Sequence, residues 1–214
     1  MIVWGGLGGI LLVDRNSVYL TMSNIAVLTE IPDQPVSIDQ NTFGHMLTPP
    51  LNIGQTIGGQ LVISSPRDQL EVVLVGNRIE VRDLSGKTEF SERKIPKLVG
   101  DLLQFITAPV KGYGINFHLT IKHDNAAQWL VDLIFSHEIK ERTGKSLVGG
   151  SATLRMEHKS KMWQITLQPR SVSELQVDFN AHENTQQLPQ EEHLQGEMAE
   201  QFDALLETLT DLGL

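Results

Sequence analysis

Strict alternation of apolar and polar residues along several short segments is the feature that most constrains the fold of this chain. Within residues 113–122 the apolar positions are Ile115, Phe117, Leu119 and Ile121, and the polar ones are Asn116, His118, Thr120 and Lys122. Successive side chains of a strand point to opposite faces, so this pattern predicts a strand with one buried and one solvated face. Similar alternation recurs within residues 152–156, 163–167 and 175–179. Consecutive one-faced strands predict an antiparallel meander.

Amphipathic helices are predicted next to these strands. Apolar residues recur at helical spacing over residues 96–107, 125–142 and 190–212, and the last of these segments is the longest. The strands therefore come in runs rather than alternating one by one with helices. We expect an α+β fold with mainly antiparallel sheet or sheets, amphipathic helices on one face and a long C-terminal helix.

The first half of the chain carries four further strand predictions and one long-loop prediction. Gly76-Asn77 joins two strand-like segments, residues 70–75 and 78–83, in the manner of a tight hairpin. Residues 10–13 and 18–28 also read as strands. Residues 31–60 contain four prolines and four glycines without any periodicity, which predicts one long loop. Long loops of this kind often carry function.

Two domain organisations stay open at this point. The 214 residues are enough for one domain with a substantial core, spanning 1–214. Each half of the chain also runs from a hairpin into an amphipathic helix, which suggests two related halves and two subdomains, 1–122 and 123–214. No repeat is visible residue by residue, so the second organisation rests on the order of elements alone.

The composition excludes some chemistry and suggests a compartment. The chain has no cysteine, which rules out disulfides and thiol nucleophiles and fits a reducing, cytoplasmic setting. Residues 2–13 are all apolar or glycine, but they are too few for a membrane span and no basic residue precedes them. We therefore expect a buried strand there and no membrane association.

Two glycine-rich segments and the histidines carry no recognisable cofactor or metal chemistry. Residues 5–9 are glycine-rich but lack the preceding strand and following helix of a dinucleotide site. Gly144-Lys145-Ser146 resembles the end of a phosphate-binding loop, yet Ile139 stands where that loop needs its first glycine. The seven histidines are scattered without ligand spacing. We therefore expect no metal and no cofactor. The sequence has no nucleophile elbow or other catalytic motif, so enzyme function stays open but is disfavoured.

The polar face of the strand at 113–122 is the first candidate site. It carries Asn116, His118, Thr120 and Lys122, which can make hydrogen bonds to a ligand, and His118 can also carry a proton. A simpler interpretation is a solvated sheet face without a ligand. If the face binds a small molecule, the 31–60 loop is the segment expected to cover it.

The acidic C-terminal helix is the second candidate site. Residues 181–214 hold eight of the 26 acidic residues and no Lys or Arg, whereas the first 180 residues are nearly neutral. Like charges one turn apart repel, and the acids concerned are Glu197, Glu200, Asp203 and Glu207. This unrelieved repulsion suggests a basic partner on the helix. Simple packing of the helix on the sheet is the alternative, and the acidity disfavours nucleic acid as a partner.

These patterns leave two functional hypotheses. The first is a protein-binding or assembly module, an inhibitor- or chaperone-like accessory protein that binds a protein partner or self-associates. Deleting residues 188–214 is then expected to abolish partner capture and leave a folded core. The second is a small-molecule-binding protein or enzyme with a pocket between the polar strand face and the 31–60 loop.

Overall fold

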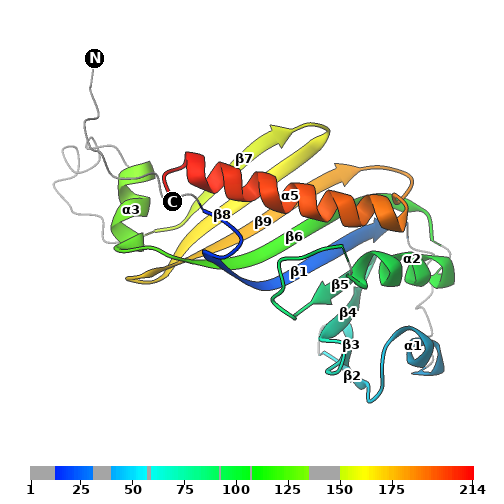
Figure 1. Ribbon diagram of the computed structural model, residues 1–214. Coiled ribbons are helices and arrows are strands. Elements are labelled where there is room, and N and C mark those ends of the chain that lie inside the picture. Colours follow the sequence, from blue (N-terminus) through cyan, green and yellow to red (C-terminus); the bar gives the residue numbers. More distant parts are fainter. Residues whose placement is uncertain (1–12, 31–39, 57–58, 92, 107, 135–149) are drawn as a thin grey trace.

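A single antiparallel sheet of nine strands forms the centre of the protein (Figure 1). The computed structural model describes residues 13–30, 40–56, 59–91, 93–106, 108–134 and 150–214. The strands are β1 (Val18–Thr29), β2 (Asn52–Gln55), β3 (Leu61–Ser65), β4 (Leu70–Val75), β5 (Arg78–Asp83), β6 (Val110–Lys122), β7 (Ala152–His158), β8 (Lys161–Ser171) and β9 (Glu174–Asn184). Their order across the sheet is β2-β3-β4-β5-β1-β6-β9-β8-β7. This confirms the predicted α+β class and the antiparallel meander at β7–β9.

Helices cover one face of this sheet. They are α1 (Gln40–Met46), α2 (Ile95–Ile106), α3 (Ala126–Ile134) and α5 (Glu191–Asp211). The long α5 lies across the sheet, with α2 beside it over the β5 side, whereas α3 contacts β8 and β9 at the far end (Figure 1). None of the helices in the described part of the chain is long and apolar enough to cross a membrane.

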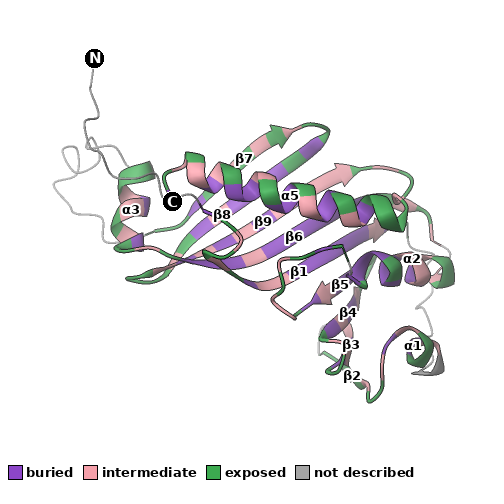
Figure 2. Ribbon diagram, viewed as in Figure 1, coloured by how far each residue is buried: buried purple, intermediate pink, exposed green. Residues whose placement is uncertain are grey.

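The main core lies between α5 and the sheet, as the apolar pattern of the C-terminal helix predicted. Every residue of that predicted helix face is buried: Leu194, Met198, Phe202, Leu205, Leu206 and Leu209. Phe202 meets Phe117 of β6 edge to face, with 5.1 Å between ring centroids, a favourable geometry for two aromatic rings. In Figure 2 the strands behind α5 accordingly carry many purple, buried residues.

The order of elements is similar in the two halves of the chain, with one more strand in the first half. The first unit runs β1-α1-β2-β3-β4-β5-α2, and the second runs β6-α3-β7-β8-β9-α5 over its described residues. The first strands of the two units, β1 and β6, pair with each other at the middle of the sheet, so one sheet runs through both units. Both predicted subdomains, 1–122 and 123–214, therefore contribute strands to this one sheet.

The described part of the predicted 31–60 loop, residues 40–56 and 59–60, contains regular elements that the sequence did not predict. These elements are α1 and β2, and β2 pairs with β3 as an edge strand. Helix α1 is short and has poor helix formers, but it buries Phe43 completely, and Leu47 just after it is buried too. Tertiary burial and cross-strand pairing stabilise these elements, and neither leaves a periodic pattern in so short a segment.

The other local predictions agree with the structure where it describes them. The hairpin strands β4 and β5 have the predicted bounds, and Gly76 between them has a φ of 56°. Helix α3 covers the first part of the predicted helix at 125–142, and the rest of that prediction lies outside the described residues. The strand predicted at residues 10–13 also lies outside them, except for Val13, which is buried.

Candidate functional site

The open face of the sheet, opposite α5, is lined by hydrogen-bonded polar side chains. Phe117 points toward α5, so its neighbours Asn116 and His118 on β6 point to the other face. The same alternation holds on β8, where Trp163 donates a hydrogen bond from Nε1 to Gln201 Oε1 of α5 at 2.8 Å and Gln164 points away. Alternation along the strands thus separates an apolar face under the helix from a polar open face.

An amide row, defined by Asn24, Asn116, Asn180 and Gln164, crosses the middle of this open face. These residues stand directly opposite one another on β1, β6, β9 and β8. Asn180 Nδ2 donates to Asn116 Oδ1 at 2.6 Å, and Asn116 Nδ2 donates to Asn24 Oδ1 at 2.6 Å. Asn24 and Asn116 are only 2% and 9% exposed. The hydrogen bonds therefore hold these amides in one arrangement.

A histidine–aspartate pair lies in the next row. His118 Nδ1 is 2.6 Å from Asp178 Oδ1 on the paired strand β9. Gln176 also donates from Nε2 to the same carboxylate, at 3.0 Å to Oδ2. A carboxylate at Nδ1 orients the imidazole ring and leaves Nε2 as the atom available to a ligand. The pair thus presents one oriented ring nitrogen at the open face.

The first half of the open face carries ion pairs instead of amides. Arg82, opposite Asn24, lies 2.8 Å from Glu71 and 2.8 Å from Glu80. Arg78 reaches the other oxygen of Glu80 at 3.1 Å. The charges of the two arginines and two glutamates offset each other. Burial lowers the pKa of Arg82, but the carboxylates of Glu80 and Glu71 outweigh burial, so the pKa of Arg82 is raised.

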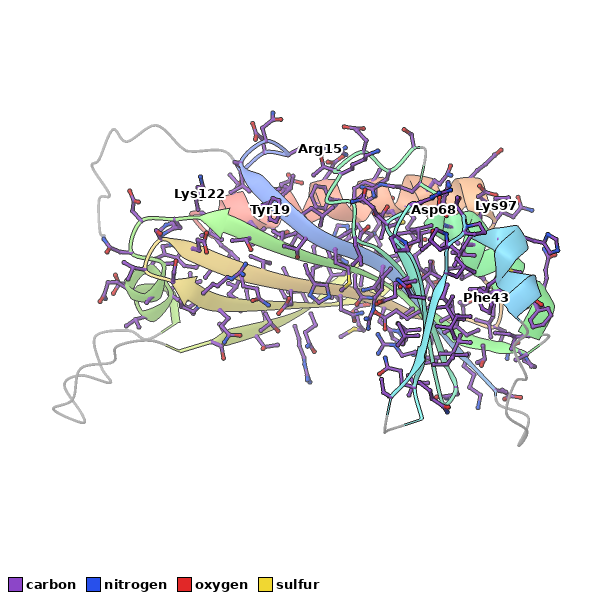
Figure 3. The ribbon with its side chains drawn as sticks, turned by 90° about the horizontal axis from the view of Figure 1, so that it is seen from below. Arg15, Tyr19, Phe43, Asp68, Lys97 and Lys122 are labelled. Carbon is purple, nitrogen blue, oxygen red and sulfur yellow. The ribbon has the colours of Figure 1, made fainter. Side chains whose placement is uncertain are left out.

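The structure brings together three of the four residues predicted as a ligand face. Asn116, His118 and Thr120 share the open face of β6, and Thr120 is largely buried there. Lys122 lies at the end of the strand, close to Tyr19 of β1 (Figure 3), and lines a cavity at that end of the sheet. Lys122 is therefore separated from the amide row by the part of β6 that lies between Asn116 and Lys122.

Several functional candidates on this face were missed in the sequence. They are Asn24 on β1 and Gln176, Asp178 and Asn180 on β9. The alternation over residues 175–179 did place Asp178 and Asn180 on a polar face. The alternation did not show which strands pair with each other, because β6 pairs with β1 and β9, which lie far from it in the sequence.

One of the acids predicted on the outer face of the C-terminal helix is instead buried in an ionic cluster. Glu197 Oε1 lies 2.5 Å from Lys161 Nζ, and both side chains are less than a tenth exposed. Lys161 also lies 2.5 Å from Glu183 Oε2 and donates to Tyr113 Oη at 2.8 Å. The Tyr113 hydroxyl donates to Glu197 Oε2 at 2.8 Å. Burial, and then the hydrogen bond to Glu197, raise the pKa of Tyr113 far above its ordinary value.

Two more of these acids have counter-ions within the chain. Glu200 pairs with Lys159, and Asp203 accepts three hydrogen bonds from Arg15, with 2.8 Å between Nη2 and Oδ1. Of the four acids singled out in the sequence, Glu207 alone has no ion pair with a described residue. The idea that their repulsion is unrelieved was therefore wrong, because long-range folding supplies cations that the helix sequence lacks.

The pocket predicted between the polar strand face and the 31–60 loop does not coincide with the cavities that described residues line. Three such cavities have volumes of about 500, 1020 and 510 Å³. Neither His118 nor any residue of 31–60 lines them. Within the described ranges, no group of three or more His, Asp or Glu side chains is placed to share a metal ion.

The sequence matches no protein-family model and no curated protein. We therefore infer function from the geometry of the open face and of the cavities.

Proposed function

We propose that this protein is a protein-binding module, inhibitor- or chaperone-like, that captures a polypeptide partner on the open face of its sheet. The observation that carries the proposal is the amide row with its mutual hydrogen bonds. Amide groups are both donors and acceptors, as are the backbone groups of a polypeptide. The proposal includes a cytoplasmic location, which the absence of cysteine supports.

Preorganisation is the physical reason to favour this face. Ordering a flexible side chain at an interface costs about 0.5–1.5 kcal/mol, and that cost weakens binding. Within the amide row, the short side chains of Asn24, Asn116 and Asn180 are fixed by hydrogen bonds to one another, and His118 is fixed by Asp178. A partner that binds them therefore loses little free energy in ordering the surface.

The C-terminal helix is a weaker candidate for the docking surface than the sequence suggested. Its apolar side is buried against the sheet, and three of the four singled-out acids already have counter-ions. Deleting residues 188–214 would also uncover Phe117, Phe179 and Trp163, which pack under the helix. Such a deletion would destabilise the core, so loss of binding would not locate the interface.

Site-specific photo-crosslinking in the full-length chain tests the proposal. A photoreactive amino acid is placed at Gln164 or Gln168, exposed positions on the open side of β8, and the protein is incubated with an extract of the cells that make it. The matched control places the same amino acid at Glu192 or Glu207, exposed positions of α5. We expect one polypeptide to crosslink from both β8 positions and from neither α5 position.

A charge reversal on the open face tests whether the crosslink from β8 depends on that face. Arg155 stands opposite Gln164 on β7 and is exposed, so Arg155→Glu alters the face without removing a buried group. This substitution is expected to reduce the β8 crosslink strongly while leaving the thermal unfolding midpoint near that of the wild type. Crosslinking from α5 instead, or to no polypeptide from either surface, contradicts the proposal.

A further inference from the structure

The largest of the three cavities lies where the two ends of the described chain meet the end of the sheet. Its volume is about 1020 Å³, which is at the upper end for sites of small organic ligands. Residues from the start of β1, the end of β6, the start of β9 and the end of α5 line it. It is distinct from the amide row, so its role is independent of the proposed protein binding.

Part of the wall is apolar. Val13, Ile121 and Leu214 line the cavity and are each less than a tenth exposed. Val13 is held there by a hydrogen bond from its backbone N–H to Thr210 Oγ1 of α5 at 3.0 Å. Leu214 is held by a backbone hydrogen bond to Leu209 at 3.1 Å, following Gly213 with a φ of 87°. Such a surface suits the hydrocarbon part of a ligand.

The polar part of the wall is mainly acidic. Asp124, Glu174 and Asp211 line the cavity, against Lys122 as its one permanent cation among the described lining residues. None of the three acids forms an ion pair with another described residue. This contrasts with Glu197, Glu200 and Asp203 of α5, which are paired. Unpaired acids from three separate segments thus meet at this cavity, and Lys122 stands directly opposite Glu174 in the sheet.

The end of α5 adds to the negative potential. A helix C-terminus carries a partial negative charge and is stabilised by cations. The last turn of α5 has no basic residue and carries Asp211 instead. A neighbouring cavity of about 510 Å³, which shares Val13, Thr210 and Asp211, is also lined by Asp14 and Glu207. A positive group at this helix end would therefore interact favourably with both the dipole and the carboxylates.

An unpaired ring nitrogen lies in the same wall. His123 Nδ1 is buried without a hydrogen-bond partner among the described residues, and the ring packs 5.4 Å from that of Trp129. Leaving a buried polar atom unpaired costs free energy.

We infer that this cavity binds a small organic cation with an apolar body, such as an amphipathic amine. The apolar residues Val13, Ile121 and Leu214 receive the hydrocarbon part. The ammonium group lies near Glu174 and Asp211, at the negative end of α5. A neutral or anionic ligand of the same shape gains the apolar contacts but not the electrostatic attraction.

Binding of n-octylamine to the full-length protein tests this inference. Octylamine, 1-octanol and octanoate share one chain length and differ in charge, and titration calorimetry near neutral pH compares their affinities. Amide chemical shifts in NMR locate the site. We expect octylamine to bind at least about tenfold more tightly than octanol, with octanoate weaker still. The largest shifts should fall on Ile121, Thr210 and Leu214.

A double variant measures what the carboxylates contribute to binding, apart from the rest of the cavity. Glu174→Gln with Asp211→Asn is expected to weaken octylamine binding about tenfold and to leave octanol binding unchanged. The matched control, Asp101→Asn with Glu192→Gln, removes two acids elsewhere and should have little effect.

Three results would overturn the inference. Equal affinity for the three ligands would show that the acids play no part, and so would unchanged octylamine binding by the double variant. Octylamine binding that appears only after deletion of residues 1–12 would show that the chain itself fills the cavity.

Discussion

Lys161 of β8 and Glu197 of α5 face each other across the helix–sheet interface, with 2.5 Å between Nζ and Oε1, and both side chains are buried. The ammonium group of Lys161 donates hydrogen bonds to Glu183 and Tyr113, and Glu197 is its buried ion-pair partner. A buried charge is tolerated only when it is paired and hydrogen-bonded, so each member of this cluster depends on the others.

Replacing Lys161 with alanine is expected to destabilise the protein by about 3–5 kcal/mol, because two carboxylates lose their buried counter-ion. Urea unfolding at neutral pH measures the change. Lys159→Ala is the matched control: it removes a lysine two residues away whose pair with Glu200 is exposed, and such surface pairs contribute only about 0–1 kcal/mol. Equal costs for the two substitutions would show that the cluster is not a buried ionic interaction.

The Tyr113 phenol is expected to resist ionisation at alkaline pH. Its folded-state pKa is raised well above 10.0, first by burial and then by the hydrogen bond to Glu197. Because the raised pKa favours the neutral phenol, this contribution to stability is complete below about pH 10 and is lost as the pH rises further.

Absorbance titration of a Tyr19→Phe variant, in which Tyr113 is the single tyrosine left of two, measures that ionisation. Tyrosinate absorbance should appear only together with loss of the folded-state circular dichroism. Ionisation of Tyr113 in the still-folded chain near pH 10 would contradict the assignment.

Asp68 is expected to make the stability of the protein fall in acid. Burial alone raises its pKa, but hydrogen bonds from Lys94, Thr48 and Ser65 outweigh burial and lower the pKa well below 3.8. A lowered folded-state pKa means that the contribution is present above about pH 4 and is lost as the pH falls through the folded pKa.

Comparison of the wild type with Asp68→Asn by urea unfolding over a range of pH tests this. The variant should be less stable by about 1–3 kcal/mol at neutral pH, where it lacks a buried carboxylate acceptor. The difference in the free energy of unfolding between the wild type and this variant should narrow steadily as the pH is lowered below about 4. Asp101→Asn, at a more exposed acid paired with Lys97, is the control and should show a small gap at every pH. A pH-independent gap for Asp68→Asn would count against the carboxylate as the cause.

Asn116→Ala is expected to lower the free energy of unfolding by about 1–3 kcal/mol, because Asn24 and Asn180 each lose a hydrogen-bond partner and Asn24 is buried. Gln164→Ala is the control from the same row: Gln164 is exposed, so its loss should change stability by less than about 0.5 kcal/mol. Thermal unfolding ranks the two variants. If both variants unfold like the wild type, the amides are mobile and the surface is not preorganised.

Much of the fold was predictable because it depends on local patterns. Alternation with a period of two identified the strands now assigned as β6 to β9, and helical periodicity identified α2 and α5, with all six residues of the predicted buried face of α5 in the core. These patterns persist in a linear sequence because each strand or helix must turn one side to the core.

The candidate sites were less predictable, because their residues are far apart in the sequence. Asn116 and His118 were recognised as polar members of a strand, but their partners Asn24, Asn180 and Asp178 became visible only through strand pairing. The acids of α5 were misread for the same reason: Lys161, Lys159 and Arg15 lie on distant segments.

Periodicity, turn residues and charge along the chain thus establish which segments are strands and helices, and that α5 is acidic and amphipathic. Three-dimensional pairing establishes the rest. It joins β1 to β6, aligns the amide row across strands, buries Glu197 against Lys161 and leaves Asp211 and Glu174 at a cavity. The physical reason is range: backbone propensity and periodicity act within a few residues, whereas hydrogen bonds, ion pairs and cavities depend on which distant segments come together.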